Sequence, residues 1–180
     1  MTRPTTDIRA AERADLLTIL DIYNHAVEHT TASYDLEPQA LAARVAWFEA
    51  RQAQGWPVLV AVQSGQVVGW GSYGTFRDKP GYRHSVEHSV YVAPGVQGSG
   101  LGTALMRPLI ERARQDGHHV MLGAVDAENA GSLRFHERLG FERVAHFRQV
   151  GHKFGRWLDM VFLQLLLEHP PEPRARPPGR

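Results

Sequence analysis

Residues 97–102, Q-G-S-G-L-G, form a glycine-rich stretch between two segments of different periodicity. Residues 85–92 before it alternate and are rich in valine, which predicts a half-buried strand that Pro94 ends. Residues 103–116 after it carry apolar residues at helical intervals. A glycine-rich turn that opens a helix presents free backbone N–H groups, and the helix dipole favours negative charge there. The stretch therefore predicts an anion-binding loop.

The order of residues in this loop narrows the choice of anion. A P-loop requires G-x-x-x-x-G-K-[ST], but no lysine follows Gly100 or Gly102. A dinucleotide fingerprint requires G-x-G-x-x-G, but Thr103 stands three residues after Gly100. The order Q-x-x-G-x-G between a strand and a helix instead resembles the pyrophosphate loop of the GNAT acetyltransferase superfamily, which binds acetyl-CoA. A plain glycine-rich turn is the alternative.

Glu87 is the candidate catalytic group of the predicted strand. Because side chains alternate along a strand, Glu87 shares a face with Ser85, Ser89 and Tyr91, and His88 faces the opposite layer. The strand leads into the glycine-rich loop, so we expect its open end to approach the acetyl group. Acetyl transfer from a thioester to an amine requires an uncharged amine, and a carboxylate can accept the ammonium proton directly or through a water.

Proton transfer to Glu87 is uphill unless the site assists it. A glutamate with a pKa of about 4.3 and an amine with a pKa of about 8 differ by roughly 5 kcal/mol. Glu87 must therefore have a raised pKa, pass the proton to solvent or mainly orient the amine. A solvated carboxylate at a strand edge is the alternative without a catalytic role.

The segment that begins at His84 reads H-S-V-E-H, which matches the zinc motif H-x-x-E-H. That motif needs a helix to bring all three ligands to one face. On a strand, His84 and His88 point to one face and Glu87 to the other, so they do not chelate one ion together. His25 and His29 lie four residues apart but have no apparent third ligand. We therefore expect no metal.

Asn129 and Ser132 open the helix expected over residues 130–139, where capping is their simplest role. The segment N-A-G-S-L-R-F-H-E-R-L-G-F also resembles the later motif of the superfamily, in which asparagine and serine touch the CoA arm. The superfamily commonly has a tyrosine there, assigned to protonation of the leaving thiolate. This chain departs from that pattern with His136 after Phe135. His136 either acts as the acid or packs on the helix.

Across residues 8–167 the chain resembles the phosphinothricin N-acetyltransferase group, close to the methionine sulfone and methionine sulfoximine acetyltransferases. The resemblance is carried by I-Y-N-H-A-V, T-T-A-S-Y, V-E-H-S-V-Y-V, N-A-G-S-L and K-F-G-R-W-L-D. It implies coenzyme contacts at Val90, Tyr91, Val92, Gly98, Ser99, Gly100, Leu101, Gly102, Thr103 and Asn129, with Ser132 beside them. It implies amino-acid binding at Arg77, Asp78, Lys79, Glu87, His88 and Ser89. Members of the group often form dimers, so a homodimer is also implied, for which the apolar C-terminal strand offers a surface.

An amino-acid acceptor agrees with the charges of the loop before the predicted strand. The guanidinium of Arg77 can grip an α-carboxylate in a bidentate pair, which also fixes where the α-amine points. Tyr34 and Tyr82 are the candidate walls of the side-chain pocket. The alternative is that Arg77, Lys79 and Arg83 are ordinary loop charges.

The elements that must position these residues follow the order β-α-α-β-β-β-α-β-α-β-β. This order predicts an α/β (α+β) class, with a mixed sheet covered by helices on both faces. The resemblance implies the GNAT fold, with a mostly antiparallel, twisted sheet of about six or seven strands. The helices are expected at residues 15–27, 38–54, 103–116 and 130–139. The strands are expected at residues 7–10, 58–62, 66–73, 85–92, 120–125, 141–150 and 157–167.

Length and composition fit one globular domain, which the resemblance makes an acetyltransferase domain over residues 1–167. A proline-rich basic tail follows at 168–180, and we expect it to be disordered. A formal net charge of +1 gives no electrostatic case for nucleic acid or an anionic membrane as partner. No stretch approaches the roughly 18 apolar residues of a membrane span, and the N-terminus lacks the apolar core of a signal peptide. A cytoplasmic location is therefore the default expectation.

The expected function is N-acetylation, by acetyl-CoA, of a small amino acid or analogue of the phosphinothricin, methionine sulfoximine or methionine sulfone type. The absence of cysteine excludes a cysteinyl acyl-enzyme and favours direct attack in a ternary complex. The alternatives are an N-acetyltransferase acting on a protein or peptide, and a non-catalytic module that binds acetyl-CoA.

Overall fold

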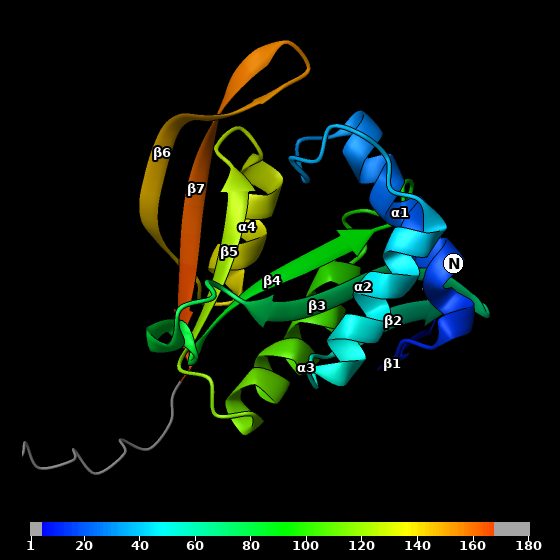
Figure 1. Cartoon of the computed structure of the whole chain (residues 1–180). Helices are drawn as coiled ribbons and strands as arrows, with labels where there is room; N and C mark the ends of the chain where they lie inside the picture. The colour runs from blue at the N-terminus through cyan, green and yellow to red at the C-terminus, as the bar shows by residue number, and fades with distance from the viewer. Residues whose placement is uncertain (1–4, 168–180) are drawn as a thin grey trace, which may run out of the picture.

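A sheet in the strand order β1-β2-β3-β4-β5-β7-β6 runs through the chain, whose computed structural model describes residues 5–167 (Figure 1). Its pairs are antiparallel except for β4 and β5, which are parallel. The mixed, mostly antiparallel sheet expected from the sequence is therefore confirmed, with seven strands. The strands are β1 (Thr6–Ala10), β2 (Val58–Gln63), β3 (Gln66–Thr75), β4 (Ser85–Val92), β5 (Val120–Asp126), β6 (Glu142–Lys153) and β7 (Arg156–Leu166).

Helices cover both faces of the sheet. The helices are α1 (Leu16–His29), α2 (Leu41–Ala53), α3 (Leu101–Gln115) and α4 (Ala130–Arg138). Trp70 of β3 packs in one core with residues of α1 and α2, such as Ile19 and Phe48. The next residue, Gly71, faces α3, where a Cβ would lie 2.9 Å from Leu109. The alternation along β3 thus separates the α1–α2 layer from the α3 layer, and glycine permits the close approach of α3.

The two central strands pair only where they begin. Their register joins Ser85 to Val120, Val86 to Met121 and Glu87 to Leu122. Beyond these pairs β4 stays with β3 and β5 stays with β7, so the parallel strands diverge (Figure 1). The sheet therefore opens in its middle, and Glu87 lies at the last pair before the opening.

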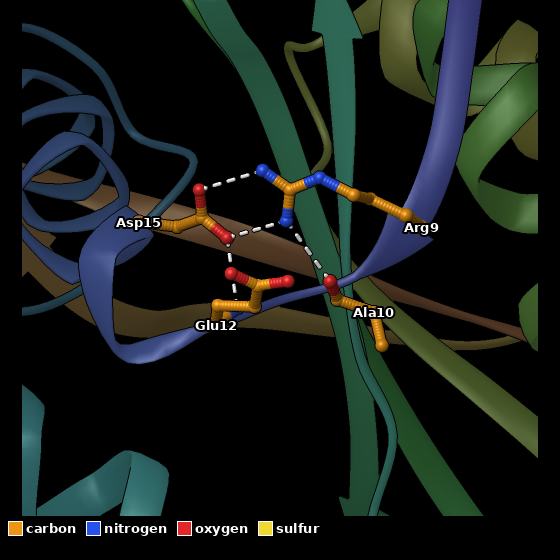
Figure 2. Close-up of polar contacts among 4 residues, drawn as sticks. All are labelled: Arg9, Ala10, Glu12 and Asp15. Carbon is orange, nitrogen blue, oxygen red and sulfur yellow. Dashed lines mark hydrogen bonds and ion pairs between the residues drawn. The ribbon is translucent and has the colours of Figure 1, made fainter.

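An ion pair fixes the entry into α1 (Figure 2). Arg9 at the end of β1 donates to both oxygens of Asp15, at 2.7 and 2.9 Å, and Asp15 also accepts from the Glu12 N–H at 2.8 Å. Asp15 is only 8% exposed. The Arg9 hydrogen bond holds the pKa of Asp15 below its ordinary value. The contact therefore ties the edge strand to the helix that walls one side of the site.

The second helix begins later than the sequence suggested. We expected Pro38 in its first turn, but α2 starts at Leu41. The cause is Asn24 of α1, whose side chain donates to the Gln39 carbonyl and accepts from the Gln39 N–H, both at 2.9 Å. This pairing occupies the backbone of Gln39 before the helix can include it.

The third helix and the last hairpin also differ at their ends. The α3 helix starts at Leu101 and not at Thr103. Strands β6 and β7 continue until a two-residue turn at Phe154 and Gly155, with φ of 53° and 72°, so the connection expected over residues 151–156 is mostly strand. The expected disordered tail at 168–180 lies outside the described residues. No helix in the range 5–167 is both long and apolar enough to cross a bilayer.

Candidate active site

A cavity of about 240 Å³ opens where β4 and β5 diverge, and we call it the cleft. Its walls come from residues 31–34, from β4, and from the end of β5 with the start of α4. A second cavity of about 480 Å³, the loop cavity, runs from there along the glycine-rich loop. Residues that line both are His88, Val90, Asn129, Ser132 and His136. An elongated ligand can therefore lie in the loop cavity with its end in the cleft.

The glycine-rich loop has the backbone of an anion site. Gly98 and Gly100 have φ of 76° and 93°, which side chains rarely adopt, and Gly100 caps α3. The first turn of α3 contains no acidic residue, so its free N–H groups face no competing negative charge. Gln97 accepts from the Gly95 N–H at 2.9 Å, so this motif residue serves the turn itself. The loop thus fits a pyrophosphate.

Most of the predicted coenzyme residues line the loop cavity, and the side chains of three others point elsewhere. The loop cavity is lined by Val90, Val92, Gly98, Gly100, Gly102, Thr103, Asn129 and Ser132. The Leu101 side chain is in the core, 3% exposed, so only its backbone can reach a ligand in this loop. The Tyr91 ring stacks on Trp70 on the α1–α2 side, with centroids 5.0 Å apart. Ser99 does not line the loop cavity, and its hydroxyl donates to the Val96 carbonyl at 2.6 Å.

Two residues of α4 were missed by the sequence reasoning although they line the loop cavity. Phe135 packs against the first turn of α3, where a Cβ on Gly102 would meet its ring at 3.1 Å. Arg138 adds a cation to the same wall. Their positions three and six residues after Ser132 follow the face of α4 that carries His136, and this helical spacing was the available signal.

Glu87 is a partly desolvated carboxylate without a partner. It lines the cleft and also a third cavity of about 220 Å³ under α2, the Arg44 pocket, whose characteristic walls are Tyr23, Arg44, Trp47, Arg51, Trp70 and Tyr73. Within residues 5–167 its carboxylate makes no hydrogen bond or ion pair. Burial raises the pKa of Glu87, and the charge of Arg77 opposes that rise. A raised pKa narrows the free-energy gap for taking a proton from an amine.

His88 and His136 form a buried pair between the cleft and the loop cavity. Their Nε2 atoms lie 3.1 Å apart, and His136 Nδ1 lies 2.7 Å from the Ser132 carbonyl. Because a carbonyl only accepts, His136 Nδ1 carries the proton, and His88 Nε2 donates to His136 Nε2. Gly123 makes the room, since a Cβ there would lie 2.7 Å from His88 Nε2.

Both imidazoles of this pair are neutral. Burial, reinforced by His136, lowers the pKa of His88 to about 3, and burial lowers the pKa of His136. In this tautomer both nitrogens of His136 are engaged, so the ring has no proton to spare for a thiolate. The packing interpretation of His136 describes this geometry, and its role as an acid stays a prediction.

The predicted acceptor residues lie in two places. Tyr34 and Ser89 line the cleft, and the Tyr34 hydroxyl is buried without a partner among the described residues. Arg77 and Tyr82, with Asp78 and Lys79, line a separate surface hollow around Phe76. Tyr82 is 40% exposed and packs on the Phe76 ring, so it does not wall the cleft in this structure.

The H-S-V-E-H segment does not converge on one point. His84 contacts the Gly117 carbonyl at 3.2 Å, and His88 pairs with His136 on the face of β4 opposite Glu87. In the part of the chain that the structure describes, no group of three or more histidine, cysteine, aspartate or glutamate side chains is placed to hold a metal ion.

The anion loop at a helix N-terminus and the carboxylate at the opening of the sheet fit an enzyme that binds a phosphate-bearing co-substrate and moves a proton beside it. The chain belongs to the Acetyltransferase (GNAT) family, whose sequence pattern matches residues 19–141. Acetyl-CoA is the co-substrate of this family. The family resemblance seen in the sequence motifs is confirmed.

Characterised proteins of similar length are close to this chain in sequence. The chain is 49% identical to the L-methionine sulfoximine/L-methionine sulfone acetyltransferase of Salmonella typhimurium, over 93% of this chain and 98% of that protein. It is 33% identical to the phosphinothricin N-acetyltransferase of Streptomyces coelicolor, over 87% of this chain and 94% of that protein.

Solved structures give the same fold. The Salmonella typhimurium acetyltransferase yncA, solved with its cofactor acetyl-CoA, has a TM-score of 0.90 and 48% identity, over 95% of this chain and 99% of that one. A ribosomal-protein-alanine N-acetyltransferase from Brucella melitensis has a TM-score of 0.87 and 49% identity, over 89% and 99%.

Proposed function

We propose that this chain transfers the acetyl group of acetyl-CoA to the α-amine of a small amino acid of the methionine sulfone, methionine sulfoximine or phosphinothricin kind. The observation that carries the proposal is the meeting of the loop cavity and the cleft beside Glu87, an unpaired carboxylate of raised pKa. The methionine sulfoximine/sulfone acetyltransferase at 49% identity supports the acceptor class.

The glycine-rich loop holds the anionic end of the co-substrate through backbone N–H groups of residues 98–103. Val90 and Val92 line the passage from that loop toward the cleft. Asn129 caps α4 by accepting from the Ser132 N–H at 3.0 Å, as its simplest role predicted, and its amide nitrogen is left to meet the coenzyme arm. Together these groups bring the thioester to the opening beside Glu87.

Acetyl-CoA supplies an acetyl thioester, which the acceptor amine attacks directly. A C–N bond forms, the C–S bond breaks, and the proton lost from the ammonium goes to Glu87 or through a water to solvent. Arg77, whose charge acts on Glu87, clamps the acceptor carboxylate and so aims the amine. The leaving thiolate takes its proton from solvent, because both ring nitrogens of His136 are engaged with Ser132 and His88. Tyr34 borders the acceptor in the cleft.

The test is release of CoA thiol with free methionine sulfone, methionine sulfoximine, phosphinothricin and standard amino acids as acceptors. A peptide with N-terminal alanine is the control, because a ribosomal-protein-alanine N-acetyltransferase shares 49% identity with the chain. We expect kcat/KM to be highest for the oxidised methionine analogues, with intersecting initial-rate lines for a ternary complex. If only the peptide is acetylated, the acceptor is a protein or peptide N-terminus and not a free amino acid.

A homodimer in the cytoplasm completes the proposal. The β6–β7 hairpin exposes large apolar side chains, including Val150 at 56%, Phe154 at 55% and Trp157 at 62%. Such a patch is typical of a protein interface. Light scattering should give twice the 20.1 kDa chain mass, and Trp157→Lys should shift it toward the monomer. A monomer at all concentrations would contradict this assembly.

A further inference from the structure

The Arg44 pocket is a second chamber on the acceptor side of the site. It lies between α2 and strands β3 and β4, and it shares Glu87, Ser89 and Tyr91 with the cleft. These residues are on the α1–α2 face of β4, away from the loop cavity. A group that enters the Arg44 pocket therefore passes the carboxylate proposed to receive the amine proton.

Arg44 is a buried cation with almost no hydrogen-bond partners. It is 3% exposed, and its guanidinium lies 4.3 Å from the Tyr23 centroid and 4.7 Å from that of Trp47. Of its N–H donors, one nitrogen donates to the Gln39 side chain at 2.8 Å, Nε is buried and unpaired, and no carboxylate within residues 5–167 forms an ion pair with it. Burial lowers the pKa of Arg44, yet a guanidinium stays charged in proteins.

Aromatic packing explains only part of this arrangement. Ring faces attract a guanidinium electrostatically, but they do not satisfy the N–H donors in its plane. Trp70 lines the same pocket, and its indole N–H is also buried without an acceptor. Arg51, two helical turns after Arg44, adds a second guanidinium, which donates to the Tyr73 carbonyl at 2.6 Å. The pocket thus combines aromatic walls with the donors of two guanidiniums, and Glu87 at its entrance is the one carboxylate that residues 5–167 contribute to its lining. This combination suits a ligand that carries oxygens on a short apolar stem.

We propose that the Arg44 pocket binds the oxygen-bearing end of the acceptor side chain, the sulfone, sulfoximine or phosphinate group, with Arg44 as the donor that selects it. The inference rests on the proposed function, which places the acceptor amine at Glu87 and the α-carboxylate toward Arg77. The remaining substituent of the α-carbon then enters the chamber of about 220 Å³ that begins at Glu87. A site built to hydrogen-bond an oxygen rejects the analogue without it.

The experiment compares methionine sulfone with methionine, which has the same skeleton without the sulfone oxygens. The kcat/KM ratio of the two acceptors is measured for the unmutated enzyme and for Arg44→Met and Arg44→Lys. We expect the ratio to fall at least about tenfold in Arg44→Met, with methionine itself changed by less than about threefold. Arg44→Lys keeps the charge but loses the planar fork, so it gives a smaller fall. The matched control is Arg13→Met, at an arginine on the surface whose side chain is 69% exposed.

Two further measurements distinguish the α-carboxylate from the side-chain oxygens as the group bound, and failure of this proposal from failure of the proposed function. If the pocket held the α-carboxylate, Arg44→Met would weaken both acceptors equally, and this result overturns the proposal. Arg77→Ala is expected to weaken both equally and leave the ratio intact. Calorimetry with methionine sulfone measures binding without turnover. If the unmutated enzyme binds methionine sulfone but does not acetylate it, and Arg44→Met does not bind it, the proposed function is rejected and the binding role of the Arg44 pocket is kept.

Folding is checked by the thermal melt of each variant. Where Arg44→Met gives no cooperative melt, Arg44→Lys decides the question. An unchanged acceptor ratio in a folded Arg44 variant overturns the inference, as does the absence of methionine sulfone binding to the unmutated protein.

Discussion

Replacing Glu87 by glutamine tests the proton transfer at the centre of the proposed mechanism. The change keeps the size of the side chain and removes its basicity. An ordinary glutamate lies about 3.7 pKa units below an amine of pKa about 8, a gap of roughly 5 kcal/mol. Burial of Glu87 raises its pKa and narrows this gap. General-base catalysis typically contributes about 10²- to 10⁴-fold, so we expect kcat at pH 7 to fall within that range.

The direction of the Glu87 pKa shift also fixes the pH dependence. Activity of the unmutated enzyme should fall on the acid side at a pH above the ordinary glutamate pKa, since the protonated carboxyl accepts nothing. Arg77 lowers this pKa, so Arg77→Ala should move the acid limb to higher pH. In Glu87→Gln the limb should vanish. The loss of kcat in Glu87→Gln should shrink as pH rises toward the pKa of the amine, because more of the acceptor then binds in its neutral form.

The thermal stability of Glu87→Gln tests the raised pKa of Glu87 independently of activity. A carboxyl whose folded pKa is raised favours the folded state below its unfolded pKa, and that contribution is lost as pH rises through the folded pKa. Glu87→Gln should therefore melt no lower than the unmutated protein at pH 7 to 8. A lower melting temperature would mean that the carboxylate has a stabilising partner that the structure does not show.

The assay is thiol release between pH 4 and 9 with saturating acetyl-CoA, and calorimetry checks that CoA affinity is unchanged. Glu87→Asp is the matched control, because it keeps a carboxylate and should keep the acid limb. A loss that is the same at every pH would assign Glu87 to positioning the amine or a water. Near-normal kcat at pH 7 in Glu87→Gln refutes both roles and moves the search for a base to His136 or solvent.

Three other changes test separate parts of the structure. Gly100→Val places a branched side chain at φ 93°, so CoA affinity measured by calorimetry should fall at least about tenfold, and unchanged affinity in a folded variant would reject the loop assignment. Arg77→Ala should lower kcat/KM for the amino acid by roughly 10- to 100-fold with little change in the KM for acetyl-CoA, and the acceptor's methyl ester should lose a similar amount with the unmutated enzyme. Asp15→Asn should cost about 1–2 kcal/mol of unfolding free energy in urea at pH 7, reduced by the partial exposure of Arg9. Because the folded pKa of Asp15 is lowered, this deficit should disappear as pH falls through it, and a constant deficit would point to packing instead.

Local patterns in the sequence predicted the central elements well. The alternation of valines defined β4 with the bounds that the structure has, and it put Glu87 and His88 on opposite faces. The glycine-rich loop and the caps of α4 were equally visible, because turn and cap residues act over a few positions.

Contacts between distant segments were beyond such patterns. The start of α2 depends on Asn24, fifteen residues before Gln39, and nothing near Pro38 signals that clamp. The turn of the last hairpin uses Phe154 at positive φ, a conformation that its residue type disfavours.

The largest omission in the candidate site was Arg44, which in sequence is an ordinary polar position of an amphipathic helix. Its burial appears only when α1, α2 and β3 bring three aromatic rings around it. The His88–His136 pair likewise needs the space left by Gly123 on a neighbouring strand. In both cases packing between distant elements decides the chemistry, and a one-dimensional pattern does not record it.

The short pairing of β4 and β5 has a consequence for how the proton acceptor is held. The paired end of the two strands is packed in a core that contains Val86 on one strand and Met121 on the other. Glu87 follows this packed end directly, opposite Leu122. The proposed proton acceptor is therefore anchored by the best-packed part of the two strands, and the space for the reactants lies on the unpaired side of it.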